Sequence, residues 1–146
     1  MQLCGIGALF ALCISVTLAQ TIESVSYDDA YGDGTQSLDT VACSETLESY
    51  GYTDFKSLPN FPYIGGASVV TGFDAPACGS CWNLTYGSTT ISVLAIDSAG
   101  NGFNIALAAM NNLTNNQAMF YGRVNATVTS VDASVCGLGQ APVIPN

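Results

Sequence analysis

Residues 73–87, FDAPACGSCWNLTYG, combine four chemically informative features within fifteen positions. They are a carboxylate, a Cys-x-x-Cys pair, the only tryptophan of the chain and an N-glycosylation sequon. Four kinds of site contain such a combination: a redox pair, a metal site, part of a catalytic cleft, and two disulfide anchors beside a sugar-binding surface. The fold and the function depend on which of these the stretch forms.

An uncharged apolar segment, residues 1–19, precedes the rest of the chain and ends with Thr17 and Ala19 at the positions that signal peptidase recognises. A membrane anchor is the competing interpretation, but about 17 apolar residues are few for a bilayer, and no basic flank follows. We therefore expect a signal peptide over 1–19 and secretion of the remainder. Its removal leaves 146 − 19 = 127 residues, the size of a single domain, over 20–146.

The charge balance and the absence of histidine exclude several classes of function. The chain has 2 basic and 11 acidic residues and a net charge of −9, so it could not neutralise the phosphates of a nucleic acid or of an anionic membrane. The sequence contains no histidine, which excludes Ser-His and Cys-His nucleophile pairs and most zinc sites. A four-cysteine zinc site would be the remaining metal option, and we expect neither a metal nor another cofactor.

Four cysteines follow the predicted signal peptide, namely Cys43, Cys78, Cys81 and Cys136. In an oxidising compartment an even number predicts two disulfides, and the sequence leaves three connectivities open. A thioredoxin-like redox pair would open a helix, whereas the neighbours of Cys78 and Cys81 are typical of a loop and a strand. The pair is therefore interpreted as two structural disulfide anchors.

Hydrophobic periodicity predicts mostly short strands. Strands are expected around Val25 and Tyr27, after the Pro/Gly loop at 61–66, and over 81–87, 89–97 and 123–132. Helices are expected from an N-cap at Ser44 to Tyr50, for one turn near 53–58, and over about 105–113. Segment 91–96 is almost continuously apolar and should be buried on both faces. These elements predict a mainly β barrel, and a sandwich fits the composition equally well.

Five segments resemble the secreted fungal cerato-platanin family in order and spacing, with all four cysteines in register, over about residues 24–138. They are VSYDDAYGDGTQSLDTVACS, FPYIGG, GFDAPACGSCW, LAIDSAGNGFNIALAAMNNLT and VDASVCGL. The resemblance implies a six-stranded double-psi β-barrel with a few short helices, similar to the first domain of expansins and to certain endoglucanases. It also implies the disulfides Cys43–Cys78 and Cys81–Cys136.

The same resemblance implies a function. Cerato-platanins are secreted or wall-associated, bind chitin oligomers, loosen wall polysaccharide without clear hydrolysis and elicit plant defence, and some self-assemble at air–water interfaces. For this chain it implies chitin or another wall polysaccharide as ligand, a host plant receptor as a further partner, and a monomer that can assemble at interfaces.

Two carboxylates, Asp97 and Asp74, lie in the matching segments. By resemblance, Asp97 matches the expansin aspartate that is the general acid of the related endoglucanases. Glycoside hydrolysis normally needs a second carboxyl group, and Asp74 is the partner that composition offers, although the family lacks a second catalytic carboxylate. The alternative roles are structural: Asp97 as a cap of the N–H groups of 98–100, and Asp74 as a cap before Pro76.

Tyr27, Asp28 and Asn104 complete the predicted carbohydrate site, because sugar sites pair aromatic faces with planar polar groups. Each has barrel packing or turn formation as its alternative role. Trp82 is expected to fill the barrel core. Three sequons begin at Asn83, Asn112 and Asn125. Asn125 is the best placed of the three for a glycan, on the outward face of its strand.

Three hypotheses of function follow. The first is a secreted, non-catalytic carbohydrate-binding protein of the cell wall that a host senses as an elicitor. The second is a weak endoglucanase or chitinase with Asp97 as its acid. The third is a surface-active protein that coats hyphae, with which the charged fraction of 9% is compatible.

Overall fold

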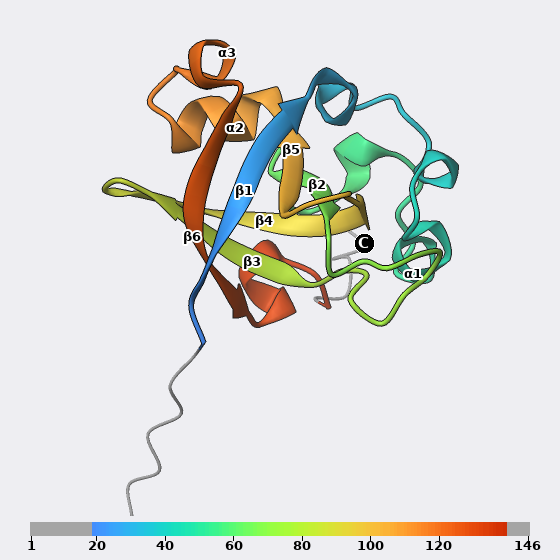
Figure 1. Ribbon diagram of the computed structural model, residues 1–146. Helices are drawn as coiled ribbons and strands as arrows, with labels where there is room; N and C mark the ends of the chain where they lie inside the picture. Colours follow the sequence, from blue (N-terminus) through green and yellow to red (C-terminus); the bar gives the residue numbers. More distant parts are fainter. Residues whose placement is uncertain (1–18, 140–146) are drawn as a thin grey trace, which may run out of the picture.

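A computed structural model describes residues 19–139 of the chain. The predicted signal peptide lies outside the described residues except for Ala19, so its cleavage stays a prediction. The described range contains a six-stranded closed barrel, as the family resemblance implied, and not a sandwich (Figure 1). Its strands are β1 (Thr21–Asp28), β2 (Ile64–Ala67), β3 (Cys81–Tyr86), β4 (Thr89–Ser98), β5 (Phe103–Ala106) and β6 (Arg123–Val131).

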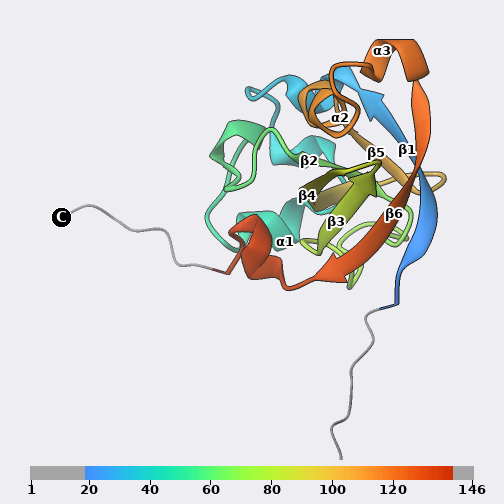
Figure 2. The ribbon, with the colours of Figure 1, turned by 90° about the vertical axis from the view of Figure 1, so that its left-hand side faces the viewer.

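The strands follow one another around the barrel in the order β1-β5-β2-β4-β3-β6. The pairs β1–β5 and β2–β4 are parallel and the other four are antiparallel, which gives the double-psi connectivity. The helices lie in two connections that join strands not paired with each other, one between β1 and β2 and one between β5 and β6. Figure 2 shows the long connection between β1 and β2 on one side of the barrel, with β1 and β6 on the other.

Three short α-helices lie outside the barrel wall: α1 (Ser44–Glu48), α2 (Leu107–Leu113) and α3 (Ala118–Tyr121). Four 3₁₀ turns complete the described secondary structure: η1 (Asp29–Gly32), η2 (Leu38–Thr40), η3 (Phe55–Ser57) and η4 (Ala133–Cys136). The helices α2 and α3 lie at the same end of the barrel (Figure 1). The connection between β1 and β2 carries α1, and the one between β5 and β6 carries α2 and α3.

Two predicted helix starts were wrong. The helix expected from about residue 105 begins at Leu107, because Phe103 and Ile105 alternate with half-exposed Asn104 in the period of two of β5. The N-cap of α1 is Cys43 and not Ser44, which is buried inside the first turn. In addition, β2 begins within the predicted Pro/Gly loop, and the expected helical turn near 53–58 is the 3₁₀ turn η3.

The burial patterns of the two long strands are confirmed. Of the predicted span 91–96 in β4, every residue is buried except the half-buried Ser92, as expected of a strand covered on both faces. In β6 the buried residues Val124, Ala126 and Val128 alternate with more exposed ones. Burying each such aliphatic side chain stabilises the barrel by roughly 1.5–3 kcal/mol relative to leaving it exposed.

Both disulfides pair as the family resemblance implied. Cys43 is bonded to Cys78 and Cys81 to Cys136, at sequence separations of 35 and 55 residues. In the chain-entropy model, closing loops of these lengths stabilises the fold by up to about 4 kcal/mol each. The two cysteines of the Cys-x-x-Cys pair therefore hold two different segments to the barrel and form no redox pair.

Strand β2 closes the barrel through two glycines that lie against neighbouring backbone. A Cβ atom on Gly65 would lie 2.3 Å from the carbonyl oxygen of Asn104, and one on Gly66 would lie 2.4 Å from that of Ser98. Both distances are far shorter than any real Cβ contact, and backbone cannot move aside as a flexible side chain can. Glycine at these positions is therefore a condition for β2 to fit between β4 and β5.

Replacing Gly65 by alanine should strongly destabilise the fold. We expect Gly65→Ala to lower the free energy of unfolding by at least about 3 kcal/mol, because the added methyl overlaps the backbone of β5. Gly72→Ala is the matched control, since a Cβ there would meet nothing within 4 Å, and it should stay within about 0.5 kcal/mol of wild type. Urea unfolding followed by circular dichroism measures both, and equal stabilities would contradict the close packing of β2.

Candidate functional site

An open groove of ≈ 620 Å³ lies over the outer face of β1 and β5. It is lined by Ser26 and Tyr27 of β1, Asn104 of β5, Arg123 of β6 and the turn 98–101. Ser26 and Asn104 point outward, because Val25 before Ser26 and both strand neighbours of Asn104 are buried in the core. Tyr27 is half-buried and packs against the core while it also lines the groove. The groove thus has hydroxyl, amide, guanidinium and aromatic groups along its walls.

The two strands under the groove are held in register by a side-chain hydrogen bond. Ser26 lies beside Asn104 in the parallel β1–β5 pair, and its hydroxyl donates to Oδ1 of Asn104 over 3.0 Å. This bond uses the oxygen of the amide and fixes its orientation. The NH₂ group of Asn104 is therefore presented as a donor for a ligand oxygen.

The turn 98–101 is fixed by the end of β2. The N–H of Ala99 donates to the carbonyl oxygen of Ala67, and the N–H of Ser68 donates to the carbonyl oxygen of Gly102. These two bonds hold both ends of the turn over the barrel wall. The turn is therefore a rigid wall of the groove and not a loose loop.

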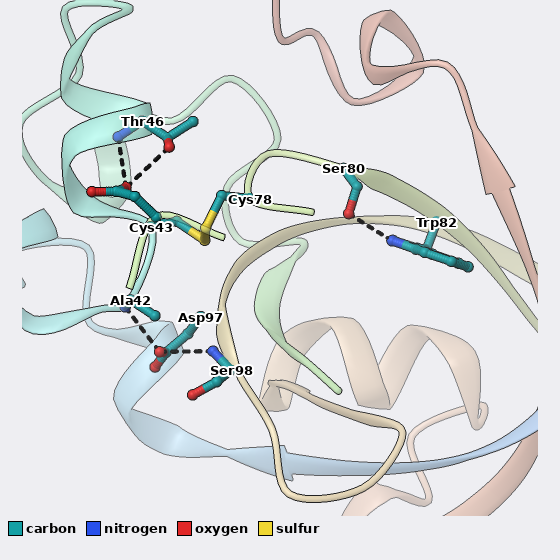
Figure 3. The surroundings of a disulfide bond; sticks show 9 residues. Ala42, Cys43, Thr46, Cys78, Ser80, Trp82, Asp97 and Ser98 are labelled. Atoms are coloured by element: carbon teal, nitrogen blue, oxygen red, sulfur yellow. Dashed lines mark hydrogen bonds between the residues drawn. A yellow bond between two sulfur atoms is a disulfide. The ribbon is translucent and has the colours of Figure 1, made fainter. Parts of the chain in front are cut away.

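Asp97 precedes this turn but its carboxylate faces away from the groove lining. It accepts hydrogen bonds from the N–H of Ser98 at 2.8 Å and of Ala42 at 3.0 Å (Figure 3), and from the hydroxyl of Tyr31 at 3.0 Å. Burial, together with the nearby Asp97 charge, raises the pKa of Tyr31 well above its usual range, so this hydroxyl stays protonated and donating even in alkaline solution. Of the predicted cap over 98–100, Asp97 therefore binds the N–H of Ser98 alone, and it also ties β4 to the segment before Cys43.

Asp74 caps a helix, but it is α1 and not the turn before Pro76. Its Oδ1 accepts from the N–H of Thr46 at 2.9 Å and from the hydroxyl of Thr46 at 3.0 Å. Thr46 is the third residue of α1. The N-cap residue of this helix, Cys43, makes no side-chain capping bond, so Asp74 supplies the cap instead. The Cys43–Cys78 disulfide brings Asp74 close to α1, and the N–H of Asp74 donates to the carbonyl oxygen of Ala42 at 2.8 Å.

The remaining predicted site residues divide between the groove and the turns. Tyr27 and Asn104 both line the groove. Asp28 is the N-cap of η1, where Oδ1 accepts from the N–H of Ala30 at 2.9 Å. The structure thus brings two of the five predicted residues together in the groove and uses the three carboxylates as caps.

Sequence reasoning missed Ser26, Arg123 and the turn 98–101 as groove residues. Arg123 is the only arginine of the chain, and that rarity was an available signal. Its Nη1 donates to the hydroxyl of Ser24, which points outward from β1 like Ser26. No periodicity indicates that β6 begins beside β1, so Arg123 could not be assigned to the groove from sequence.

Trp82 packs against the core but is only partly buried. Its Nε1 donates to the hydroxyl of Ser80 at 2.8 Å (Figure 3), and its ring meets Phe103 edge-on with centroids 5.6 Å apart. This arrangement satisfies the indole N–H while the ring covers the barrel.

The three sequon asparagines differ in access. Asn83 is half-buried and accepts a bond from the hydroxyl of Ser92, whereas Asn112 and Asn125 are exposed. Nδ2 of Asn112 donates to the hydroxyl of Tyr63. Asn125, on the outward face of β6, has the access that a glycan needs, and glycosylation stays a prediction for all three.

Exposed apolar side chains gather on α3. Met119 and Phe120 are 78% and 80% exposed, and the ring of Phe120 lies 5.3 Å from that of Tyr121. Tyr86 of β3 joins them, with its ring centroid 6.1 Å from that of Tyr121. We call these four residues the α3 patch.

No metal site or membrane helix is found within residues 19–139. No group of three or more His, Cys, Asp or Glu side chains in that range is arranged to hold a metal ion. The same range contains no helix with the length and apolar character needed to cross a bilayer.

Comparison with known proteins identifies the family. The cerato-platanin family model matches residues 23–138. This chain belongs to the cerato-platanin family. Among its relatives, the allergen Asp f 15 of Aspergillus fumigatus is 44% identical over 118 residues, which cover 80% of this chain and 78% of the allergen.

Solved cerato-platanin structures share the fold. The crystal structure of cerato-platanin 1 from M. perniciosa superimposes with a TM-score of 0.75 at 42% identity, over 78% of this chain and 98% of that one. The solution structure of the fungal elicitor Cerato-Platanin gives a TM-score of 0.70 at 35% identity, over 77% of this chain and 95% of that one. The predicted family and barrel are thereby confirmed.

The capping role of Asp74 can be measured. Asp74→Ala should lower the free energy of unfolding by about 2 kcal/mol. It removes the helix cap, and it places alanine, whose side chain cannot form a local hydrogen bond, at the left-handed φ of 43°. Asp74→Asn keeps an acceptor oxygen and tolerates a positive φ, so it should lose clearly less. Urea unfolding of both variants tests this, and equal losses would contradict the cap.

Proposed function

We propose that this protein is a secreted, non-catalytic carbohydrate-binding protein of the fungal cell wall that binds chitin, as N-acetylglucosamine oligomers, loosens wall polysaccharide as expansins do, and acts as an elicitor of plant defence. The observation that carries this proposal is the groove over β1 and β5. Its walls combine the features of sugar sites, namely outward hydroxyl and amide groups beside an aromatic side chain.

The groove favours weak and reversible binding. It is open, so a bound oligomer would stay partly in water and bury little area. The NH₂ group of Asn104 and the hydroxyl of Ser98 are suited to sugar hydroxyls and to the acetamido oxygen of N-acetylglucosamine. Weak binding of this kind suits a protein that moves among wall polymers and separates them without cutting them.

The arrangement of the carboxylates supports a function without hydrolysis. Among the described residues, those that line the groove include no Asp or Glu. The carboxylate of Asp97 is held by Ser98, Ala42 and Tyr31, and that of Asp74 by Thr46. Hydrolysis of a glycosidic bond requires an acid and a base or nucleophile on either side of that bond. The endoglucanase alternative lacks that pair.

Secretion and sensing by a host are supported by three observations. The predicted signal peptide directs the chain to the secretory route, and two disulfides are typical of an oxidising compartment. One relative is named an allergen and another a fungal elicitor, so both of those proteins are recognised by a host. We extend this recognition to the present chain, with a plant receptor as the partner.

Binding without turnover is the test of this proposal. The folded domain should bind N-acetylglucosamine oligomers and release no reducing sugar from chitin or soluble glucan. Asn104→Ala should weaken binding about fivefold, because one neutral hydrogen bond is worth about 1 kcal/mol. Asn112→Ala, on α2 outside the groove, should bind like wild type. Titration calorimetry and a reducing-end assay measure these outcomes, and turnover by the wild type would overturn the non-catalytic assignment.

We propose surface activity as a second function, because the α3 patch favours it. Met119 and Phe120 are exposed on a short helix at one end of the barrel, where they would enter an air–water or other apolar interface. Other apolar side chains, among them Ile22, Phe73 and Val135, are exposed elsewhere on the described surface, so the proposal rests on the gathering of apolar side chains in the α3 patch. A layer of such molecules could coat a hypha.

The surface activity should depend on the patch. The double variant Met119→Ser/Phe120→Ser should lower surface tension less than wild type at equal concentration, since it removes the two most exposed apolar side chains of α3. Val135→Ser is the control, because Val135 is also exposed, at 54%, but lies on η4 outside the patch. Pendant-drop tensiometry measures the effect, and equal loss in both proteins would remove the α3 patch from this role.

A further inference from the structure

The groove differs in charge from the rest of the molecule. The chain has 11 acidic and 2 basic residues, yet the described groove lining holds Arg123 and no carboxylate. One of only two basic side chains therefore lies at the site where a ligand would bind. A neutral sugar would not require that placement.

The carboxylates nearest to the groove in sequence point into the fold or into turns. Asp97 directly precedes the lining residue Ser98, but its oxygens accept bonds from Ala42, Ser98 and Tyr31. Asp28 directly follows Tyr27, and its Oδ1 accepts from the N–H of Ala30. Neither side chain forms an ion pair with Arg123.

Arg123 itself is bound to a neutral group. Its Nη1 donates to the hydroxyl of Ser24, and a guanidinium has five N–H donors, so several donors are left for a ligand. The other basic side chain, Lys56, has its Nζ 3.7 Å from Oδ2 of Asp54, and this is the ion pair found in the described part of the chain. Arg123 is thus the exposed cation that has no carboxylate partner among the described residues.

We infer that the groove prefers oligosaccharides that carry a carboxylate, such as those built from uronic acids, and that Arg123 binds this carboxylate. The inference rests on the proposed function, because it takes the groove as the sugar site. A guanidinium matches the two oxygens of a carboxylate with two parallel N–H donors. Asn104, Ser98 and the ring of Tyr27 then hold the hydroxyls and the apolar face of the same sugar.

The net charge of −9 opposes an anionic ligand only at long range. At physiological ionic strength, charges farther away than about 8 Å are largely screened, whereas the contact between Arg123 and a carboxylate acts at hydrogen-bond distance. Short acidic oligomers should therefore bind despite the acidic surface. A long polyanion would pass over many other carboxylates of the protein and bind less well per sugar.

The test compares three trimers: galacturonic acid trimer, the same trimer after reduction of its carboxyl groups to the neutral galactose form, and N-acetylglucosamine trimer. Each is titrated into the folded wild-type domain and into Arg123→Gln, Arg123→Lys and Lys56→Gln. Arg123→Gln and Lys56→Gln both change the net charge from −9 to −10, so Lys56→Gln controls for overall charge. Melting curves verify that every variant is folded.

We expect the wild type and Lys56→Gln to bind the acidic trimer roughly two- to fivefold tighter than its neutral form, the size expected of an exposed ion pair. Arg123→Gln should lose this preference, and Arg123→Lys should keep part of it because it has the charge without the planar fork. The preference should fall as salt is raised.

Three results separate this inference from the proposed function. The inference is overturned if the wild type binds the acidic and neutral trimers with equal affinity, or if Arg123→Gln keeps the preference for the acidic trimer. Binding of N-acetylglucosamine trimer would in that case still support chitin as ligand. Binding of the acidic trimer alone, dependent on Arg123, supports the inference and overturns chitin as ligand. Binding of none of the three overturns both.

Discussion

The close backbone packing of β2 is the constraint on which the rest of the structure depends. β4 and β5 are consecutive in the chain, but they are not paired with each other, because β2 lies between them. The strand fits there since Gly65 and Gly66 have no Cβ to meet the backbone on either side. The turn from β4 to β5 must therefore cross the end of β2. The carbonyl oxygen of Ala67 accepts a hydrogen bond from one end of this turn, and the N–H of Ser68 donates one to the other end. That crossing builds one wall of the groove.

The acidic residues of the candidate site stabilise the fold more than they prepare chemistry. Asp97 and Asp74 bind the segment before and within α1 from two sides, and the Cys43–Cys78 disulfide joins the same region covalently. The carboxylate of Asp97 accepts three internal hydrogen bonds, so few of its lone pairs are left for a substrate proton. Oδ2 of Asp74 has no hydrogen-bond partner, but it is buried and Asp74 does not line the groove. The groove is consequently left to neutral groups and one guanidinium. This arrangement agrees with the proposed function, in which the groove binds a polysaccharide without cleaving it.

The surface divides into regions of different chemistry that agree with a protein of the wall. The groove offers polar contacts to a sugar chain, and the α3 patch offers apolar side chains to an interface. Arg123 begins β6 directly after Gly122, which ends α3, so the two regions are connected by a single residue. The net charge of −9 gives such molecules a mutual repulsion that opposes their association in solution. Binding to a wall polymer and assembly at a surface could then occur on one molecule.

Local sequence determined the long strands and the number of disulfides. The apolar run of β4 and the alternation of β6 follow from which faces are buried, which is a property of neighbouring residues and is readable from periodicity. The disulfide pairing and the barrel type came from the family resemblance, because spacing alone left three connectivities open. Only the tertiary structure placed β5. This strand has four residues and runs directly into α2, and four residues are too few for their alternation to be distinguished from the helical pattern that follows. The tertiary structure alone also brought Ser26, Asn104 and Arg123 from three strands into one groove and turned the carboxylates away from that groove. Which side chains of different strands meet depends on the strand order and register around the closed barrel.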